Sequence, residues 1–459
     1  MLKLMFLISC VVAFSNISAQ GKEALISRFV PNTVDIRSIG MGKTEAATYS
    51  GSNALFTNPS LLSLQENKSI RLGSVLHFGF AKDEFLDEIS DANDTDIKYG
   101  YKPNFKFSHI SFSLPFHLQF PSVPLSFAFG IGYQNAIDLS FTQYQNEEQQ
   151  AINGKLYNST ITKYTGGLNT ITPGFAFGLL DQISVGISFN IGFGNIKLKT
   201  TSEYKTPGGK EETDSIVTAT GKAFYPTIGI SGKPLQNMTI GLSFSTSYEW
   251  EWDDMESEKR TDEEDKEVEY YGAEFTMPPI FSVGLEYQIT PKFSIAAEYQ
   301  NRPLASFESD NFYKDDLSFD KYIDSIDLEN GHVLHLGAEF IAGKVPLRLG
   351  FFMEPYAVTD KELTSSGNIR YDENPNYLIG GTLGLGIPIR ENALIDVAAQ
   401  YGRLKTTKES FNITNYRKTK YDEIQHLIRV DLGINIDLPS IYIKKAVSTA
   451  APGSARSNI

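Results

Sequence analysis

Strand-length stretches of this chain alternate apolar residues with small or polar ones. In residues 183–194 every odd position is Ile, Val or Phe, and every even position is Ser, Gly or Asn. Successive side chains of a strand point to opposite faces, so one face of this stretch is apolar and the other is nearly bare. The pattern predicts strands that meet lipid on one side and water or cargo on the other, as in a transmembrane β-barrel.

Fourteen stretches follow this pattern, and the links between them alternate between tight and long. An even strand number, with short turns on one side and long loops on the other, is typical of single-chain bacterial barrels. We therefore predict an all-β, 14-stranded antiparallel transmembrane β-barrel. The stretches are residues 70–81, 105–116, 124–134, 171–180, 183–198, 223–231, 238–252, 275–289, 293–300, 333–341, 345–353, 377–388, 394–401 and 426–437.

The seventh stretch, residues 238–252, ends in aromatic residues next to a long polar link. Its alternation predicts that Tyr248 and Trp250 face outward in an interfacial girdle, and that Glu249 and Glu251 face the lumen. The long links themselves, among them residues 199–222 and 253–274, are predicted to be polar loops.

The N-terminus reads as a signal peptide over residues 1–19. Lys3 gives a positive start, an apolar run follows, and Ala19 offers a cleavage site. An alternative is a lipoprotein modified at Cys10, but the apolar run continues past that residue. Cys10 is the only cysteine, so cleavage after Ala19 would leave a chain without disulfides or thiolate sites.

The segment that follows the signal peptide lacks a clean two-residue period. A 14-stranded barrel is too wide for its own side chains to fill, so residues 20–69 are predicted to form a plug, or hatch, inside the lumen. The barrel is then expected over residues 70–443. The tail, residues 444–459, is small and polar and is expected to be flexible.

Charge limits the possible partners. The formal net charge is −14, and residues 253–270 are strongly acidic, which disfavours nucleic acid. The acidic run suits a solvated surface loop, or alternatively a divalent-cation site that bridges to lipopolysaccharide. The expected surroundings are outer-membrane lipid and lipopolysaccharide.

No motif supports catalysis, a metal or a cofactor. His332 and His335 are three residues apart on a strand, so they face opposite ways and cannot share a metal ion. Residues 35–44 resemble a nucleotide-binding loop, but the first required glycine falls at Arg37. We expect no enzymatic activity.

Two arginines on the predicted lumen face are candidate ligand-binding residues. A guanidinium group pairs well with a carboxylate, so Arg348 or Arg429 could receive the head group of an amphipathic ligand. The alternative is that such groups form ion pairs that hold plug and wall together.

The stretch of residues 38–62 resembles the FadL family of outer-membrane channels. In that family a glycine-rich turn leads through an alanine-rich segment to an Asn-Pro-Ala motif before the first strand. The resemblance implies an outer-membrane location, passive uptake of long-chain fatty acids or other hydrophobic small molecules, and sideways exit through the wall. The plug or gating residues that it implies are Gly40, Gly42, Asn58, Pro59 and Ser60, with serine where the family motif has alanine.

The same residues also resemble the PorV-type barrels of type IX secretion. Those barrels share the fold but shuttle proteins, so the resemblance implies a secreted protein or secretion component as partner. A lipid channel should instead contain an apolar pocket that runs inward from the long loops. We predict a hydrophobic-compound channel, with the PorV-like shuttle as the alternative.

Overall fold

The computed structural model describes most of the barrel and much of the predicted plug. The predicted signal peptide, and the predicted tail after Lys444, lie outside the described residues. The described residues are 32–48, 51–85, 98–99, 104–119, 124–151, 154–180, 182–206, 209–261, 264–310, 326–328, 330–356, 358–360, 369–371, 376–412, 417–439 and 441–444.

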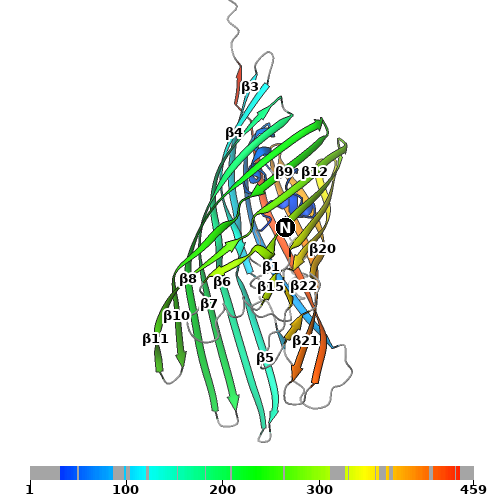
Figure 1. The fold of residues 1–459 in the computed structure, drawn as a ribbon. Helices are drawn as coiled ribbons and strands as arrows, with labels where there is room; N and C mark the ends of the chain where they lie inside the picture. The colour runs from blue at the N-terminus through cyan, green and yellow to red at the C-terminus, as the bar shows by residue number, and fades with distance from the viewer. Residues whose placement is uncertain are drawn as a thin grey trace, which may run out of the picture.

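The chain forms a closed antiparallel barrel of 14 strands, as the sequence predicts (Figure 1). The first strand closes the sheet by pairing with the last over its whole length, from Lys68 opposite Leu438 to Phe85 opposite Tyr421. The wall strands are β1 (Lys68–Phe85), β3 (Asn104–Gln119), β4 (Pro124–Asp138), β6 (Gly154–Leu179), β7 (Ile183–Thr206), β8 (Gly209–Leu235), β9 (Met238–Ser245) continued by β10 (Tyr248–Thr261), β11 (Glu264–Met277) continued by β12 (Ile280–Thr290), β13 (Phe293–Arg302), β16 (Gly331–Ala342), β17 (Val345–Tyr356), β20 (Asn376–Arg390), β21 (Ala393–Asn412) and β22 (Arg417–Leu438).

Short strands extend the sheet at both ends of the barrel. At the end with the tight turns, β23 pairs with β3 in parallel, with Ile441 opposite Phe116. A separate two-stranded sheet joins β15 to β18. The short strands are β2 (Lys98–Tyr99), β5 (Phe141–Ala151), β14 (Glu308–Asp310), β15 (Ile326–Leu328), β18 (Val358–Asp360), β19 (Ile369–Tyr371) and β23 (Ile441–Lys444).

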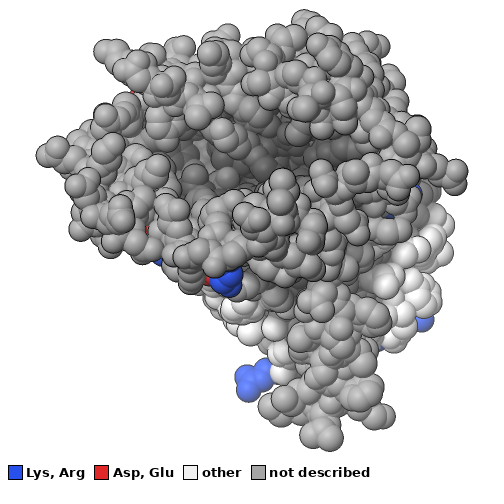
Figure 2. Space-filling model, turned by 90° about the horizontal axis from the view of Figure 1, so that it is seen from below, with Lys and Arg blue, Asp and Glu red and all other residues white. Residues whose placement is uncertain are grey.

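Several predicted loops are strands instead. β7 and β8 stay paired up to Thr206 opposite Gly209, and β10 and β11 up to Thr261 opposite Glu264. The prediction of loops there was wrong because alternation marks a strand only where one face meets lipid. Outside the membrane a hairpin can be polar on both faces, because its two strands still satisfy each other's backbone hydrogen bonds. These long hairpins extend toward the lower end of the barrel in Figure 1, the end that Figure 2 views from below.

The two faces of the wall differ as the alternation predicts. On β4 the outward Phe129 and Ile131 are 58% and 53% exposed, whereas the inward Ser126 and Ala128 are buried. Large exposed apolar side chains recur around the wall, which suits contact with lipid acyl chains. Among the described residues, no helix is long and apolar enough to cross a membrane.

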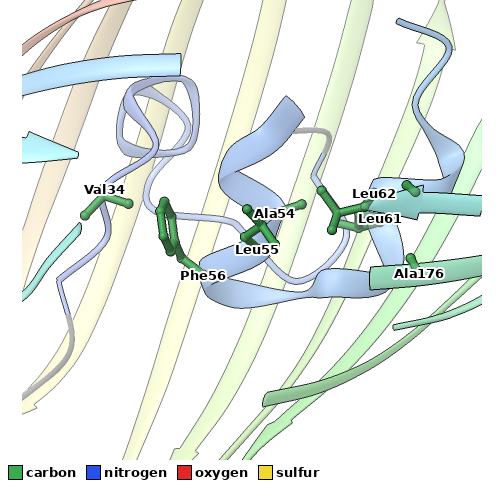
Figure 3. Packing of buried hydrophobic residues seen from close by; sticks show 8 residues of the cluster. Val34, Ala54, Leu55, Phe56, Leu61, Leu62 and Ala176 are labelled. Carbon is green, nitrogen blue, oxygen red and sulfur yellow. The ribbon is translucent and has the colours of Figure 1, made fainter. Parts of the chain in front are cut away.

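Among the described residues before the first strand, four short helices lie within the barrel (Figure 1). We call the described residues 32–48 and 51–64 the plug. Its apolar core is formed mainly by Leu55, Phe56, Leu61 and Leu62, which pack with Ala176 of β6 (Figure 3). The helices are α3 (Ile36–Gly40), η1 (Gly51–Asn53), α4 (Ala54–Thr57) and η2 (Pro59–Leu64).

Candidate functional site

The plug backbone lies directly against glycines of the wall. A Cβ atom on Gly350 of β17 would lie 1.9 Å from the Gly42 nitrogen, and one on Gly40 would lie 2.9 Å from the Gly384 Cα atom. Gly42 also has a φ of +70°, a conformation that L side chains rarely adopt. The small inner face of these strands therefore seats the plug, and is not an empty lumen at this level.

Asn58, Pro59 and Ser60 form a buried corner of the plug. Asn58 caps helix η2, because its Oδ1 accepts hydrogen bonds from the Ser60 nitrogen at 3.3 Å and the Ser60 hydroxyl at 2.6 Å. Its Nδ2 donates to the Ala46 carbonyl at 2.5 Å. The asparagine thus joins two turns of the plug, and a gating role for this corner stays a prediction.

Ion pairs attach the plug to the wall. The Arg37 guanidinium lies 2.8 Å from Glu286 and 2.9 Å from Glu339, and the Lys43 ammonium lies 2.8 Å from Glu354. Each of these carboxylates comes from a different wall strand: β12, β16 and β17. These ion pairs therefore hold the plug against the part of the wall that contains β12, β16 and β17.

The two arginines proposed from sequence as carboxylate receivers already have protein partners. Arg348 pairs with Glu339 at 2.7 Å and with Asp396. Arg429 pairs with Asp431 at 2.7 Å, and its Nη2 donates to the carbonyl of Thr33 at 2.7 Å. Arg348 therefore joins wall strands to each other, and Arg429 joins the wall to the plug. A ligand role for either stays a prediction.

The wall is interrupted at one level of its seventh and eighth strands. Thr246 and Ser247 separate β9 from β10, and on the neighbouring strand Pro278 and Pro279 separate β11 from β12. The ladder between these strands runs to Ser245 opposite Ile280 and restarts at Tyr248 opposite Met277. Proline has no backbone N–H to donate, which explains the gap. We call these four residues the wall break.

The wall break inverts the alternation of both strands. Tyr248 and Trp250 are 7% and 0% exposed, so they face the lumen, whereas Glu249 and Glu251 are exposed. The predicted outward girdle and inward carboxylates were therefore wrong, because a break that adds one residue moves every later side chain to the opposite face. On the neighbouring strand Phe275 turns inward in the same way.

A cavity of about 80 Å³ lies between the plug and the wall break. The plug contributes Asn32, Thr33, Glu45, Ala46, Phe56 and Thr57, and the wall break contributes Thr246 and Pro278. The other lining residues are mostly polar, with two tyrosines: Gln134, Tyr225, Ser243, Ser245, Tyr248, Ile280, Ser282, Glu298, Gln300, Arg302 and His335. The cavity is therefore not the mainly apolar pocket expected of a lipid channel.

Unsatisfied polar atoms cluster around this cavity. Within the described residues, Glu45 Oε1, Tyr248 OH and His335 Nδ1 are buried without hydrogen-bond partners. Arg302 is 8% exposed, and its Nε donates to Gln300 Oε1 at 2.6 Å. Neither terminal nitrogen of Arg302 has a hydrogen bond or ion pair to a residue that the structure describes. The orphaned atoms of Glu45, Tyr248 and His335 call for a water, ion or ligand.

The plug carboxyl of Glu45 is electrostatically strained. Burial, followed by the nearby carboxylates of Glu298 and Asp35, holds the pKa of Glu45 well above its ordinary value. Glu298 itself uses one carboxylate oxygen to accept the Glu45 and Ala46 backbone N–H groups, at 2.5 and 2.7 Å. Within the described part of the chain, no group of three or more acidic, His or Cys side chains could hold a metal ion.

Sequence reasoning did not bring the residues of this cavity together. Arg302 lies just after the ninth predicted strand, residues 293–300. The alternation of that strand therefore could not assign Arg302 to a face of the wall. The available signal was the consecutive pair Pro278 and Pro279, which cannot continue a strand ladder and so marks the wall break.

A family model described as BamG matches residues 90–422. The chain belongs to the BamG family. The matched region spans most of the barrel and begins after the plug. Membership of the family is therefore shown by the barrel strands and not by the plug. A search of the curated proteins found no match to this BamG-family sequence.

Solved structures share the fold of this BamG-family protein at low sequence identity. A Pseudomonas aeruginosa FadL homologue is 10% identical, with 92% of this chain and 100% of that chain covered and a TM-score of 0.57. The Ralstonia pickettii toluene transporter TbuX is 15% identical, with 87% and 97% covered and a TM-score of 0.53. The Pseudomonas putida toluene transporter TodX is 13% identical, with 92% and 99% covered and a TM-score of 0.50.

These likenesses confirm the FadL-type fold predicted from the plug motif and the strand count. A barrel of this type with an apolar outer face is an outer-membrane protein. Its tight turns then face the periplasm and its long hairpins face the cell exterior. The PorV-like alternative stays a prediction.

Proposed function

We propose that this protein is an outer-membrane conduit for the passive uptake of hydrophobic or amphipathic small molecules. The observation that carries the proposal is the cavity between the plug and the wall break. Five of its lining residues lie in or next to the gap in the wall ladder: Ser245, Thr246, Tyr248, Pro278 and Ile280.

Two stacked tyrosines supply the apolar surface of this cavity. Tyr225 and Tyr248 both line it, and their rings lie 4.2 Å apart. Transfer of apolar surface from water is favourable by about 25 cal/mol per Å². A molecule with a small apolar body can therefore reach the plug without a chemical step.

Passage beyond the cavity requires the plug to move. The ion pairs of Arg37 and Lys43 and the seated Gly42 hold it in a closed position. Structural neighbours include proteins described as toluene transporters, which supports a small-molecule cargo. The cavity volume of about 80 Å³ favours a compact molecule over a long acyl chain in this closed state. Long-chain fatty acids remain a predicted cargo for an opened state.

A disulfide that locks the plug to the wall tests the proposal. The hydroxyls of Ser52 in the plug and Ser111 on β3 lie 2.8 Å apart, so the double variant Ser52→Cys with Ser111→Cys should form a bond without large movement. A matched control joins two wall strands away from the cavity: the Thr172 hydroxyl on β6 donates to Asn190 Oδ1 on β7 at 2.9 Å, so Thr172→Cys with Asn190→Cys leaves the plug free.

Flux of a labelled hydrophobic compound into proteoliposomes is the readout. We expect oxidation to abolish saturable flux through the plug-locked variant, reduction to restore it, and the wall-locked control to conduct in both states. Flux that is equally absent from all variants and from the unmodified protein would contradict the proposal. Co-purification of a secreted protein on the long hairpins would then favour the shuttle.

A further inference from the structure

We propose that the cavity beside the wall break binds a small aromatic carboxylate, with Arg302 as the residue that receives the carboxylate group. This inference rests on the proposed function, because it names the class of molecule held at the same cavity. It assigns a role to an arginine that neither the plug motif nor strand parity singled out.

Arg302 is a buried cation with open hydrogen-bonding capacity. Its side chain is held in place by the Nε donation to Gln300, at 2.6 Å, while both terminal nitrogens lack partners among the described residues. This contrasts with Arg348 and Arg429, which are paired with carboxylates at 2.7 Å. A guanidinium fork matches the two oxygens of a carboxylate. Among the described residues no carboxylate lies within ion-pair distance of Arg302, although three lie near enough to interact with its charge: Glu45, Glu298 and Glu354.

The Tyr248 hydroxyl is buried without a partner among the described residues and can donate a second hydrogen bond to the same carboxylate. Glu298 is occupied by the backbone N–H groups of Glu45 and Ala46.

The walls next to these donors suit a ring. Tyr225 and Tyr248 stack with an interplanar angle of 16°, and both line the cavity with Phe56 and Pro278. The volume of about 80 Å³ is smaller than the roughly 150 Å³ of a cavity that holds benzene, so the cavity takes the head group and the ring extends toward the wall break. Aromatic rings are the apolar bodies that pair most favourably with such a surface.

Ligand-observed fluorine NMR on detergent-solubilised protein tests the assignment, with 4-fluorobenzoate as the probe. Its neutral analogue 4-fluorobenzamide and the hydrocarbon 4-fluorotoluene are the comparison probes. We expect 4-fluorobenzoate to bind saturably, and Arg302→Gln to weaken its binding about tenfold or more, as loss of a hydrogen bond to a charged group does. Tyr248→Phe, which keeps the stacked ring, should weaken it several-fold.

Arg71→Gln is the matched control. Arg71 is also buried, at 5% exposure, but pairs with Asp437 and does not line the cavity. Unchanged 4-fluorobenzoate affinity in both Arg302→Gln and Tyr248→Phe would overturn the assignment, as would equal affinity for 4-fluorobenzamide. Binding of 4-fluorotoluene alone would refute the carboxylate but leave the conduit standing, whereas loss of plug-dependent flux would refute the conduit. Heat-modifiable migration on gels verifies that each variant is folded.

Discussion

The side-chain amide of Asn58 donates a 2.5 Å hydrogen bond to the carbonyl oxygen of Ala46, twelve residues earlier in the plug. The other end of the same amide caps helix η2. Asn58 is 0% exposed, so water cannot replace either partner. One side chain therefore fixes the relative position of the plug turn that faces the cavity and the helix that leads to the first strand.

Asn58→Ala should loosen the plug. The change leaves the Ala46 carbonyl and the Ser60 N–H unsatisfied in a buried site, at a cost of about 1–3 kcal/mol for each group. We expect faster cleavage of the plug in limited proteolysis, with the barrel itself intact. Asn237→Ala removes a comparable amide, which donates to the Gln288 carbonyl at an exposed turn, and should leave proteolysis unchanged. Equal protection of the plug in both variants would contradict this role.

A single methyl group on the wall should unseat the plug. Gly350→Ala would place a Cβ 1.9 Å from the Gly42 nitrogen, which is backbone and cannot rotate away. We expect the plug to shift and ionic conductance in planar bilayers to rise. Gly381→Ala on the neighbouring strand is the control, because its nearest heavy atom would be 3.6 Å away. If conductance stays at the wild-type level in Gly350→Ala, the plug does not seal at this contact.

The wall could be read from the sequence because lipid imposes a period of two on every spanning strand. Alternation located all fourteen strands, including β7 and β22, and the motif around Asn58 located the plug. The long hairpins escaped prediction because water accepts polar residues on both faces of a strand. The orientation of Trp250 escaped because it depends on one extra residue at the wall break.

The cavity was still less predictable than the wall. Its lining joins residues as distant in sequence as Glu45 and His335, and only the closure of the barrel brings them together. The sequence shows that Arg348 lies in a predicted strand and that Arg302 lies just after one. Whether each has a carboxylate partner depends on neighbouring strands and on where the plug lies.

Plug stability should depend on pH through Glu45. Its pKa is raised in the folded protein, so the folded state binds more protons than the unfolded state above the ordinary carboxyl pKa of about 4.3. Stability is then greatest at acidic pH and falls as pH rises toward the raised pKa. We expect Glu45→Gln to flatten this dependence and to unfold at a higher temperature than wild type near pH 8.

Thermal unfolding followed between about pH 4 and pH 8 measures this effect. Glu66→Gln is the control, because Glu66 is an exposed residue between the plug and β1. It should track the wild-type curve. A Glu45→Gln curve parallel to wild type over the whole range would show that Glu45 does not carry the dependence.

Tryptophan fluorescence should show that the wall break turns Trp250 away from lipid. Trp250 and Trp252 are the only tryptophans, so Trp252→Phe leaves a single fluorophore at a position that is 0% exposed. We expect blue-shifted emission that brominated acyl chains in the bilayer do not quench. As a matched control, Phe244→Trp combined with Trp250→Phe and Trp252→Phe places the fluorophore on the same strand before the break. Phe244 is 41% exposed on the outer face, so this control should be strongly quenched. Similar quenching in the two proteins would mean that the alternation continues through Thr246 and Ser247, and that the aromatic surface of the proposed uptake route faces the membrane instead.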